Sequence, residues 1–536
     1  GGGGGGVSLV ELLHFLLLDG PVVFPGQITL DETGAYNYLS YADIEARLAS
    51  LKLQYPDLVE IYTAQDRFQL PSAGNCGAGP CKVWVMELRN SATVNPNTPE
   101  VFYSGTIHGN ERVGPTAVVE FATLLLEGYK DGHRWAKRLL DTRKLTIVPC
   151  GNAVGYYSNV REELGVDPNR DFAWDQRADL CMKTVAARAI NELYRVHVFQ
   201  LSATFHGGDN LVAYPWGDNI HCLSPNYQGY CAGGWIAPDD TGMNRLTNTI
   251  RDFAGEFPGQ AKYKTGALND PAVIYPVAGG MEDWAYGASW NTEGKVTCTP
   301  PSFNANGGYA ADKTQYGNAT HRAVNLLVET AFMKAPNAGT LGSHVGLFNP
   351  SAAGDGHIPR NIRLCWVLAD SVEPYVDIVN QADIPTSVAE RVAFNVVWRP
   401  GGAFSADFTE IVCLVPGGTG ESLCDVEDTP QGLSLWTNGA PQPPIVTRVT
   451  MKAGAASDAS GGRTLAMYVR MRVDTGFASA SRPENGKGPP QTHFVRARTD
   501  DSWFAANEGH FVEGKRTWSS VPVNIRVTKT GLRSGK

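Results

Sequence analysis

Apolar residues between positions 41 and 330 follow two different spacings, one typical of helices and one of short strands. In the stretch YADIEARLASLKLQYPDLV, Ile44, Leu48 and Leu51 recur at helical spacing, and this predicted helix should end before Pro56. Short apolar or alternating runs lie at 82–88, 101–107, 144–150, 199–205 and 324–329. Because helical stretches separate these runs, the pattern predicts an α/β layer architecture.

The helical spacing disappears after residues 332–344, a segment rich in Gly, Pro and Ala. In TLAMYVRMRV the apolar residues occupy alternate positions from Leu465 to Val473, as expected for a half-buried strand. Further strand-like runs are predicted at 358–369, 391–400, 444–451 and 520–527. Gly- and Pro-rich loops separate them, so we predict a first domain over 35–338 and a separate all-β sandwich domain over 339–536.

The composition is that of an ordinary globular protein. Of its 536 residues, 43% are hydrophobic and 18% are charged, and the length suits two or three domains. The net charge of −9 gives no reason to expect a nucleic-acid surface. We assign no role to the segment 1–34, since a signal remnant, a cloning remnant and a short amphipathic helix all fit it. Its apolar run is too short and too interrupted to span a bilayer, and no other stretch approaches that length.

Ten cysteines, several of them closely spaced, favour an oxidising compartment. Three pairs enclose short Gly- or Pro-rich loops and are predicted to form disulfides: Cys76 with Cys81, Cys222 with Cys231, and Cys413 with Cys424. Cys150, Cys181 and Cys365 stay open as buried thiols. One glycosylation sequon, NAT at Asn318, adds weak support for secretion. We therefore expect a secreted or extracellular glycoprotein, with the cell surface and an endomembrane lumen as alternatives.

Two histidines and one glutamate stand directly after predicted strands. His108 and Glu111 follow the run 101–107, and His206 follows the run 199–205. In open α/β sheets, ligands bind at the carboxyl ends of the strands. The HxxE pattern alone is more often a surface turn than a metal site. Together with His206 it supplies three ligands that leave a position open for water, and imidazole with carboxylate suits Zn²⁺ better than Ca²⁺ or Mg²⁺.

Five motifs together resemble the zinc metallocarboxypeptidases, the family of carboxypeptidases A, B and E, over about residues 41–335. They are HGNE, GVDPNRDF, ATFHGGDNLVAYPWG, IYPVAGGMEDWAYG and NLLVET, and their HGG is most similar to the carboxypeptidase E/N branch. The resemblance implies a mixed β-sheet flanked by helices and a catalytic Zn²⁺ held by His108, Glu111 and His206. It also implies that the substrate is the C-terminus of a peptide or protein.

Further residues receive roles from the same resemblance. Glu329 would be the general base, with Glu282 and Glu293 as rival acids. Arg161 would stabilise the oxyanion. The terminal carboxylate of the substrate would be bound by an amide, a guanidinium fork and a mobile phenol: Asn169, Arg170 and Tyr275.

Glu282 carries the expected substrate preference. By resemblance it lies at the base of the pocket for the C-terminal side chain, where the E-type enzymes have Gln. A carboxylate there favours Lys or Arg, because a buried charge needs a partner. The E-type branch has an Asp after its YPF motif, whereas this chain has Gly217 followed by Asp218, and that departure weakens the preference for basic residues.

Two segments depart from the family. The segment 285–328 is longer than the corresponding connection in relatives, and we expect it to roof the active site. The predicted β-domain is larger than the transthyretin-like domain of the E-type branch. Docking on the first domain, contacts with glycans and self-association all fit a sandwich.

The leading hypothesis is a zinc-dependent exopeptidase that removes a C-terminal residue. The alternative from another class is a non-catalytic structural or binding protein of an extracellular assembly, which 59 glycines and a large β-domain would suit. A third hypothesis is another zinc amidohydrolase on the same scaffold, such as a peptidoglycan carboxypeptidase or a deglutamylase. Glu282 argues against acidic C-terminal residues, because like charges would meet in the pocket.

Overall fold

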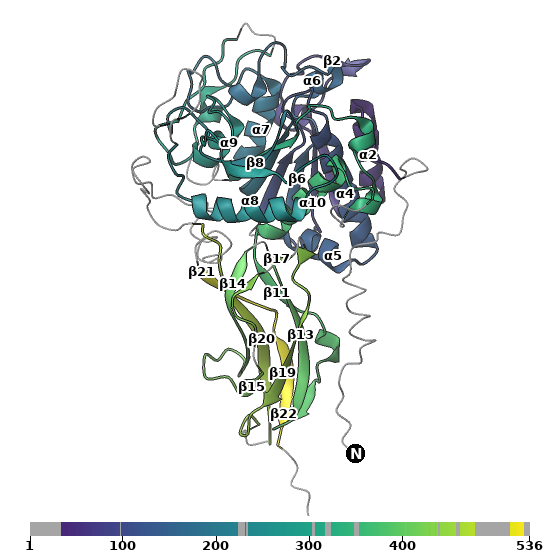
Figure 1. Ribbon diagram of the computed structural model, residues 1–536, viewed down its shortest axis with the longest axis vertical. Coiled ribbons are helices and arrows are strands. Elements are labelled where there is room, and N and C mark those ends of the chain that lie inside the picture. The colour runs from purple at the N-terminus through teal and green to yellow at the C-terminus, as the bar shows by residue number, and fades with distance from the viewer. Residues whose placement is uncertain are drawn as a thin grey trace, which may run out of the picture. The chain divides into compact units, whose positions relative to one another are not determined.

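The computed structural model describes residues 34–529 except for 97, 223–230, 232–233, 303–305, 317–322, 348–352, 403, 428, 435, 438–439, 457–460 and 478–514. The chain divides into two compact units (Figure 1), an α/β unit that runs to Val372 and a β unit that begins at Glu373. The N-terminal segment up to residue 33 and the sequon at Asn318 lie outside the described residues.

An eight-stranded mixed sheet is the centre of the α/β unit, with the strand order β1-β4-β6-β5-β7-β10-β8-β9. The strands are β1 (Val59–Thr63), β4 (Trp84–Leu88), β5 (Glu100–Ser104), β6 (Lys144–Val148), β7 (Phe199–His206), β8 (Asp209–Tyr214), β9 (Lys264–Ala267) and β10 (Val324–Ala331). Neighbours from β6 to β10 in this order are parallel, whereas β1–β4, β4–β6 and β10–β8 are antiparallel.

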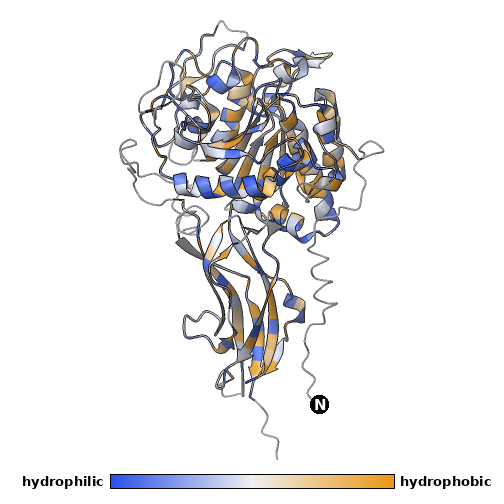
Figure 2. Cartoon of the chain, viewed as in Figure 1, coloured by the Kyte–Doolittle hydropathy of each residue, from blue (hydrophilic) through white to orange (hydrophobic). Residues whose placement is uncertain are grey.

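Helices surround this sheet (Figure 1), which confirms the predicted fold class. They are α2 (Tyr41–Gln54), α3 (Ala64–Phe68), α4 (Val113–Lys130), α5 (Arg134–Thr142), α6 (Ala153–Ser158), α7 (Val185–Val196), α8 (Asp240–Ala254), α9 (Met281–Gly287) and α10 (His357–Ser371). The predicted first helix is α2: the Ser40 side chain caps it, and Ile44, Leu48 and Leu51 are buried. Apolar residues concentrate on the strands of the sheet, whereas the visible side of α8 is largely polar (Figure 2).

The predicted strand at 358–369 is wrong, because these residues form helix α10. Every residue from His357 to Ser371 is buried, and the helix packs against α4 and α8. A helix that is buried on all sides needs no polar face, so its apolar run resembles that of a buried strand. The domain boundary that we expected between 338 and 339 is also wrong. The α/β unit includes α10 and runs to Val372.

Two larger sheets form the β unit, with the strand orders β11-β13-β19-β15 and β12-β22-β20-β14-β16. Their strands are β11 (Tyr375–Ile378), β12 (Ser387–Ala389), β13 (Ala393–Gly401), β14 (Ser405–Leu414), β15 (Cys424–Val426), β16 (Leu433–Ser434), β19 (Ile445–Met451), β20 (Gly462–Asp474) and β22 (Val523–Thr528). In β20 the predicted alternation is confirmed: the positions from Leu465 to Val473 in steps of two are buried, and Tyr468, Arg470 and Arg472 are partly exposed.

Four disulfides are formed among the described residues. The three predicted pairs are present: Cys76–Cys81, Cys222–Cys231 and Cys413–Cys424. A fourth joins Cys181 to Cys298, whereas Cys150 and Cys365 are buried free thiols. Within the described part of the chain, no helix has both the length and the apolar character needed to cross a membrane.

Candidate metal centre and active site

Three adjacent parallel strands bring the predicted site residues to one edge of the central sheet. His108 lies four residues after the end of β5, His206 ends β7, and Glu329 lies in β10 opposite His206. Because β5 pairs with β7 and β7 pairs with β10 in parallel, their carboxyl ends meet at the same edge. This is the edge where α/β sheets bind ligands.

A tight turn folds Glu111 back toward His108. The backbone N–H of Glu111 donates to the carbonyl oxygen of His108 at 3.1 Å, and α4 begins two residues later. Gly109 is required in this turn, because a Cβ atom there would lie 2.0 Å from the carbonyl carbon of Gly155. The side chains of His108 and Glu111 therefore point at one place.

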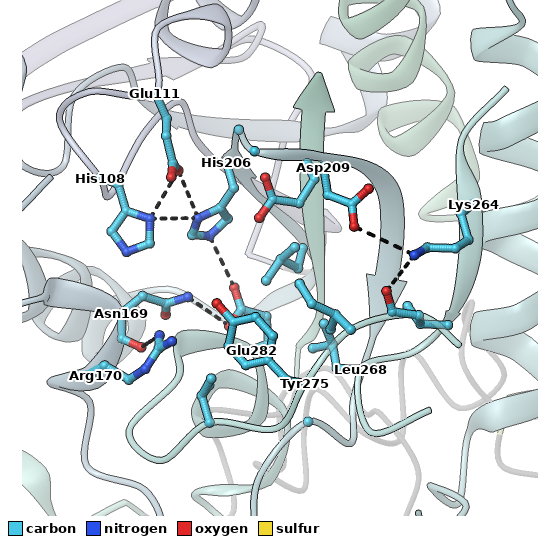
Figure 3. Close-up of a pocket in the computed structure, with 18 of the residues that line it drawn as sticks. His108, Glu111, Asn169, Arg170, His206, Asp209, Lys264, Leu268, Tyr275 and Glu282 are labelled. Atoms are coloured by element: carbon cyan, nitrogen blue, oxygen red, sulfur yellow. Dashed lines mark hydrogen bonds and ion pairs between the residues drawn. The ribbon is translucent and has the colours of Figure 1, made fainter. Parts of the chain in front are cut away.

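Three buried atoms with lone pairs face one another at this place (Figure 3). The Nδ1 atoms of His108 and His206 are 3.1 Å apart, and Glu111 Oε2 lies 3.0 Å from the first and 3.2 Å from the second. Ligands on a tetrahedral Zn²⁺ with bonds of about 2.0–2.1 Å are separated by about 3.3 Å, so the triangle fits this ion. Among the described residues it is the one group of three such ligands close enough to share a metal.

Asp167 fixes the orientation of the His108 ring. Its Oδ1 lies 2.9 Å from His108 Nε2, which leaves Nδ1 of that ring available to a metal. Its Oδ2 accepts hydrogen bonds from Nε and Nη2 of Arg161 at 3.0 and 2.8 Å. Arg161 and Lys334 also meet the outer oxygen of Glu111, since Arg161 Nη1 and Lys334 Nζ lie 3.3 and 3.2 Å from Oε1.

The charges around the triangle suit a cation. Burial alone would lower the pKa of His206, but the carboxylates of Glu111 and Glu282 raise it to about 10. Carboxylates beside an imidazole are also an arrangement that favours a divalent cation. Burial raises the pKa of Glu329 to about 7, and its Oε2 is buried without a hydrogen bond to any described residue.

A cavity of about 490 Å³ opens from the triangle. Its lining includes all of the predicted site residues, namely His108, Glu111, Arg161, Asn169, Arg170, His206, Tyr275, Glu282 and Glu329. Asn169 uses its amide oxygen to accept from the backbone N–H of Met281 at 2.8 Å, and its Nδ2 donates to Glu282 Oε2 at 3.4 Å. One N–H of the Asn169 amide therefore remains for a ligand. Tyr275 lines the cavity and is 46% exposed.

Glu282 lines the cavity from the first turn of α9 and is only 2% exposed. Its side chain is directed at Asn169 and at His206, whose Nε2 lies 3.7 Å from Glu282 Oε1 (Figure 3). Gly217 also lines the cavity, but Asp218 does not, and it accepts a hydrogen bond from Trp174 Nε1 at 2.7 Å instead.

The expected roof over the active site is not formed by the described residues of segment 285–328, of which Leu327 alone lines the cavity. The segment packs beside α7 instead. Tyr309 donates to Glu192 Oε1 at 2.8 Å, Arg188 Nη1 donates to the carbonyl oxygen of Asn306 at 2.7 Å, and Cys298 is joined to Cys181, four residues before that helix. The physical reason is that the buried polar groups of α7 need partners, and this segment supplies them. Glu293, one of the rival acids, does not line the cavity either.

Asp167 and Lys334 contact the metal-binding residues, but the sequence reasoning assigned neither of them a role. Asp167 lies in GVDPNRDF, two residues before Asn169. An acidic residue inside a substrate-binding motif could therefore have indicated a role for Asp167 at the site. Lys334 follows the end of β10, and no spacing in the sequence relates it to Glu111.

Comparison with known proteins agrees with this geometry. Residues 44–300 match the zinc carboxypeptidase family model, a range that contains every predicted site residue except Glu329. Carboxypeptidase SOL1 of Arabidopsis thaliana is 29% identical over 209 residues, covering 38% of this chain and 40% of the relative. Carboxypeptidase M of Mus musculus is 25% identical over 271 residues, covering 47% and 57%. The chain thus spans about half the length of these relatives.

The crystal structure of thrombin activatable fibrinolysis inhibitor is similar at 14% sequence identity with a TM-score of 0.40, covering 62% of this chain and 73% of that one. Because this TM-score is low, the description of the fold relies on the strand order of the central sheet and not on the similarity to this structure. The range that matches the family model includes the three residues of the ligand triangle, His108, Glu111 and His206. Residues 44–300 of the α/β unit thus match the zinc carboxypeptidase family.

Proposed function

We propose that this protein is a zinc-dependent exopeptidase that hydrolyses the C-terminal peptide bond of peptides or proteins. One observation supports this most directly: the ligand triangle, an acid with an unpaired buried oxygen and the predicted carboxylate-binding residues share one cavity. An exopeptidase needs these elements within reach of one peptide bond.

Bound Zn²⁺ would make a water molecule acidic near neutral pH and polarise the carbonyl group that is attacked. Glu329 would take a proton from that water and pass it to the nitrogen of the leaving residue. Its pKa of about 7 suits a group that must both accept and return a proton near neutral pH. Its position opposite His206 in the parallel register of β10 and β7 puts it beside the metal ligands.

Arg161 would donate an N–H to the oxygen of the attacked carbonyl as negative charge develops there. Its guanidinium is held by Asp167 and Glu111, so it is oriented before the substrate arrives. A donor that is already in place does not have to reorganise during the reaction.

The terminal carboxylate would be bound by Arg170 and by the remaining N–H of Asn169. A guanidinium and an amide offer two N–H donors to the two carboxylate oxygens. Tyr275, which is 46% exposed, would close over the bound residue. Binding of this carboxylate limits cleavage to the end of a chain.

For the side chain of the leaving residue we propose a preference for Lys or Arg. Glu282 Oε1 is buried and has no hydrogen bond among the described residues, and a cation is a fitting partner for such an oxygen. The apolar residues Leu268, Val273 and Leu327 in the cavity lining would contact the methylene groups of a long basic side chain.

A panel of peptides that differ only in the C-terminal residue tests these proposals. We expect cleavage of Lys and Arg ends, loss of cleavage with a zinc chelator, and recovery when Zn²⁺ is added back. Equal cleavage of all ends would contradict the basic preference alone. Failure of a zinc-loaded sample to cleave any peptide would favour the non-catalytic alternative.

We also propose that the protein works outside the cytosol, since four disulfides persist best in an oxidising compartment. The β unit would then contact proteins or glycans there. Recovery of the protein in a cytosolic fraction with all thiols reduced would contradict this location.

A further inference from the structure

The Nε2 atom of His206 and the Oε1 atom of Glu282 form an unusual pair. They lie 3.7 Å apart, both are buried, and neither has a hydrogen bond to any described residue. The side chains of the two residues are each only 2% exposed. Each atom is therefore a suitable partner for the other.

Metal binding determines which nitrogen of His206 carries the ring proton. Nδ1 of His206 belongs to the ligand triangle and must present a lone pair to the ion. The ring proton then resides on Nε2, where it points at Glu282 Oε1. A movement of about 0.8 Å would shorten the separation to about 2.9 Å, the usual length of an N–H···O hydrogen bond.

The other histidine of the triangle already has this arrangement. Asp167 Oδ1 lies 2.9 Å from Nε2 of His108 and fixes its ring. Carboxylates behind metal-bound imidazoles set the tautomer and strengthen the ligand. With Glu282 in the same role, both histidines of the site would have a carboxylate behind them.

Glu282 is itself held in place on its second oxygen. Oε2 accepts from Asn169 Nδ2 at 3.4 Å, and Asn169 is fixed by the backbone N–H of Met281 at 2.8 Å. The next residue, Asp283, accepts from the backbone N–H of Gly217 at 2.9 and 3.0 Å, which anchors the first turn of α9. The carboxylate of Glu282 therefore stands between the metal ligand His206 and the substrate-binding residue Asn169.

We propose that Glu282 is a positioning residue for the metal site: it accepts the Nε2 proton of His206 and fixes that ring with Nδ1 directed at the ion. The inference rests on the proposed zinc site, and it is compatible with the substrate preference because one carboxylate oxygen can accept two hydrogen bonds. It also connects Asn169 to His206, so a bound terminal carboxylate and the metal site share one side chain.

The test is the affinity for Zn²⁺, measured by competition with a chromophoric chelator in the absence of any peptide. We expect Glu282→Leu, which removes the acceptor, to weaken binding about 10–100-fold, the range typical of such outer partners. Glu282→Gln keeps an accepting oxygen without the charge, so its loss should be smaller. Asp167→Asn is the positive control, and Glu120→Gln is the matched control, because Glu120 is a buried carboxylate that pairs with Arg47 and does not line the cavity.

The absorption spectrum of the Co²⁺-loaded protein gives a second readout. Reorientation of the His206 ring would shift the visible bands in Glu282→Leu, whereas Glu120→Gln should leave them in place. The inference is overturned if Glu282→Leu and Glu282→Gln bind Zn²⁺ as the unmodified chain does while Asp167→Asn binds it more weakly. If Glu282→Leu does not fold, the isosteric Glu282→Gln decides by itself through the same two measurements. An unmodified chain that binds no Zn²⁺ would instead refute the proposed function.

Discussion

Glu329 of β10 stands directly opposite His206 of β7, two parallel strands that are neighbours in the central sheet. The carboxylate proposed as the base therefore sits one strand away from a metal ligand. The position is set by backbone hydrogen bonds and does not depend on a loop. The Oε2 atom of Glu329 is buried and has no hydrogen bond among the described residues, which leaves it available to a water molecule.

Glu329→Gln should leave the metal bound and abolish most of the turnover. The amide cannot accept the proton of the water, so we expect kcat to fall by about 10³-fold or more. Zinc content by elemental analysis and kcat on a basic-ended peptide check this together. Turnover near that of the unmodified chain would mean that another acid, with Glu282 first among the rivals, is the base.

Arg161 and Lys334 both contact Oε1 of Glu111, yet their replacement should have different effects. We expect Arg161→Met to lower kcat by about 10²–10³-fold, the usual effect of losing a donor to the oxyanion. Lys334→Met removes a cation from the same oxygen but no proposed contact with the substrate, so its effect on kcat should be under about 10-fold. If both variants lose the same factor in kcat, the effect of Arg161 comes from its charge near Glu111 and not from contact with the substrate.

The disulfide Cys181–Cys298 should stabilise the fold more than Cys76–Cys81 does. It links residues 117 apart in sequence, whereas the other pair is 5 apart. Closing loops of these lengths corresponds to about 5 and about 2 kcal/mol in the chain-entropy model. Urea unfolding of the two double Cys→Ser variants measures both losses. A smaller loss for Cys181→Ser/Cys298→Ser would indicate that segment 285–328 stays ordered in the unfolded chain or contributes little to the fold.

His197 stabilises the α/β unit, and this contribution should be lost as the pH rises. Burial would lower its pKa, but the carboxylates of Glu100 and Glu87 raise it from 6.5 to about 9. The folded protein then holds the proton more tightly than the unfolded chain, so the stabilisation is complete below about pH 6.5 and is lost as the pH rises through 9. The full effect is at most about 3 kcal/mol.

The difference in unfolding free energy between the unmodified chain and His197→Gln isolates this contribution. We expect the difference to be larger at pH 6.5 than at pH 9.5, measured by urea unfolding at both values. A difference that does not change with pH would mean that His197 contributes through packing and neutral hydrogen bonds.

The sequence was sufficient to predict five of the eight strands of the central sheet and the ligand triangle, because the signals were local. His108 and Glu111 are three residues apart after a strand, and His206 follows another strand. The contacts of Lys334 and of Cys181 with Cys298 were not predictable in this way. They join residues 223 and 117 apart in sequence, so they depend on how distant elements pack.

The strand predicted at 358–369 shows the limit of periodicity as a signal. Burial on all sides removes the polar face that distinguishes a helix from a buried strand. For the described residues of segment 285–328, the expected role was wrong for a different reason. A long connection beside an active site suggests a roof, but the polar side chains of α7, such as Glu192, hold the described part of it elsewhere.

Helix α10 decides how this protein can be divided for study. A fragment that ends at residue 338 would lack a helix that packs on both α4 and α8. Such a fragment would expose the apolar sides of those two helices to water and would be prone to aggregate. A recombinant α/β unit intended for assays or crystals should therefore extend to Val372, 34 residues beyond the Gly/Pro-rich boundary that the sequence pattern suggests.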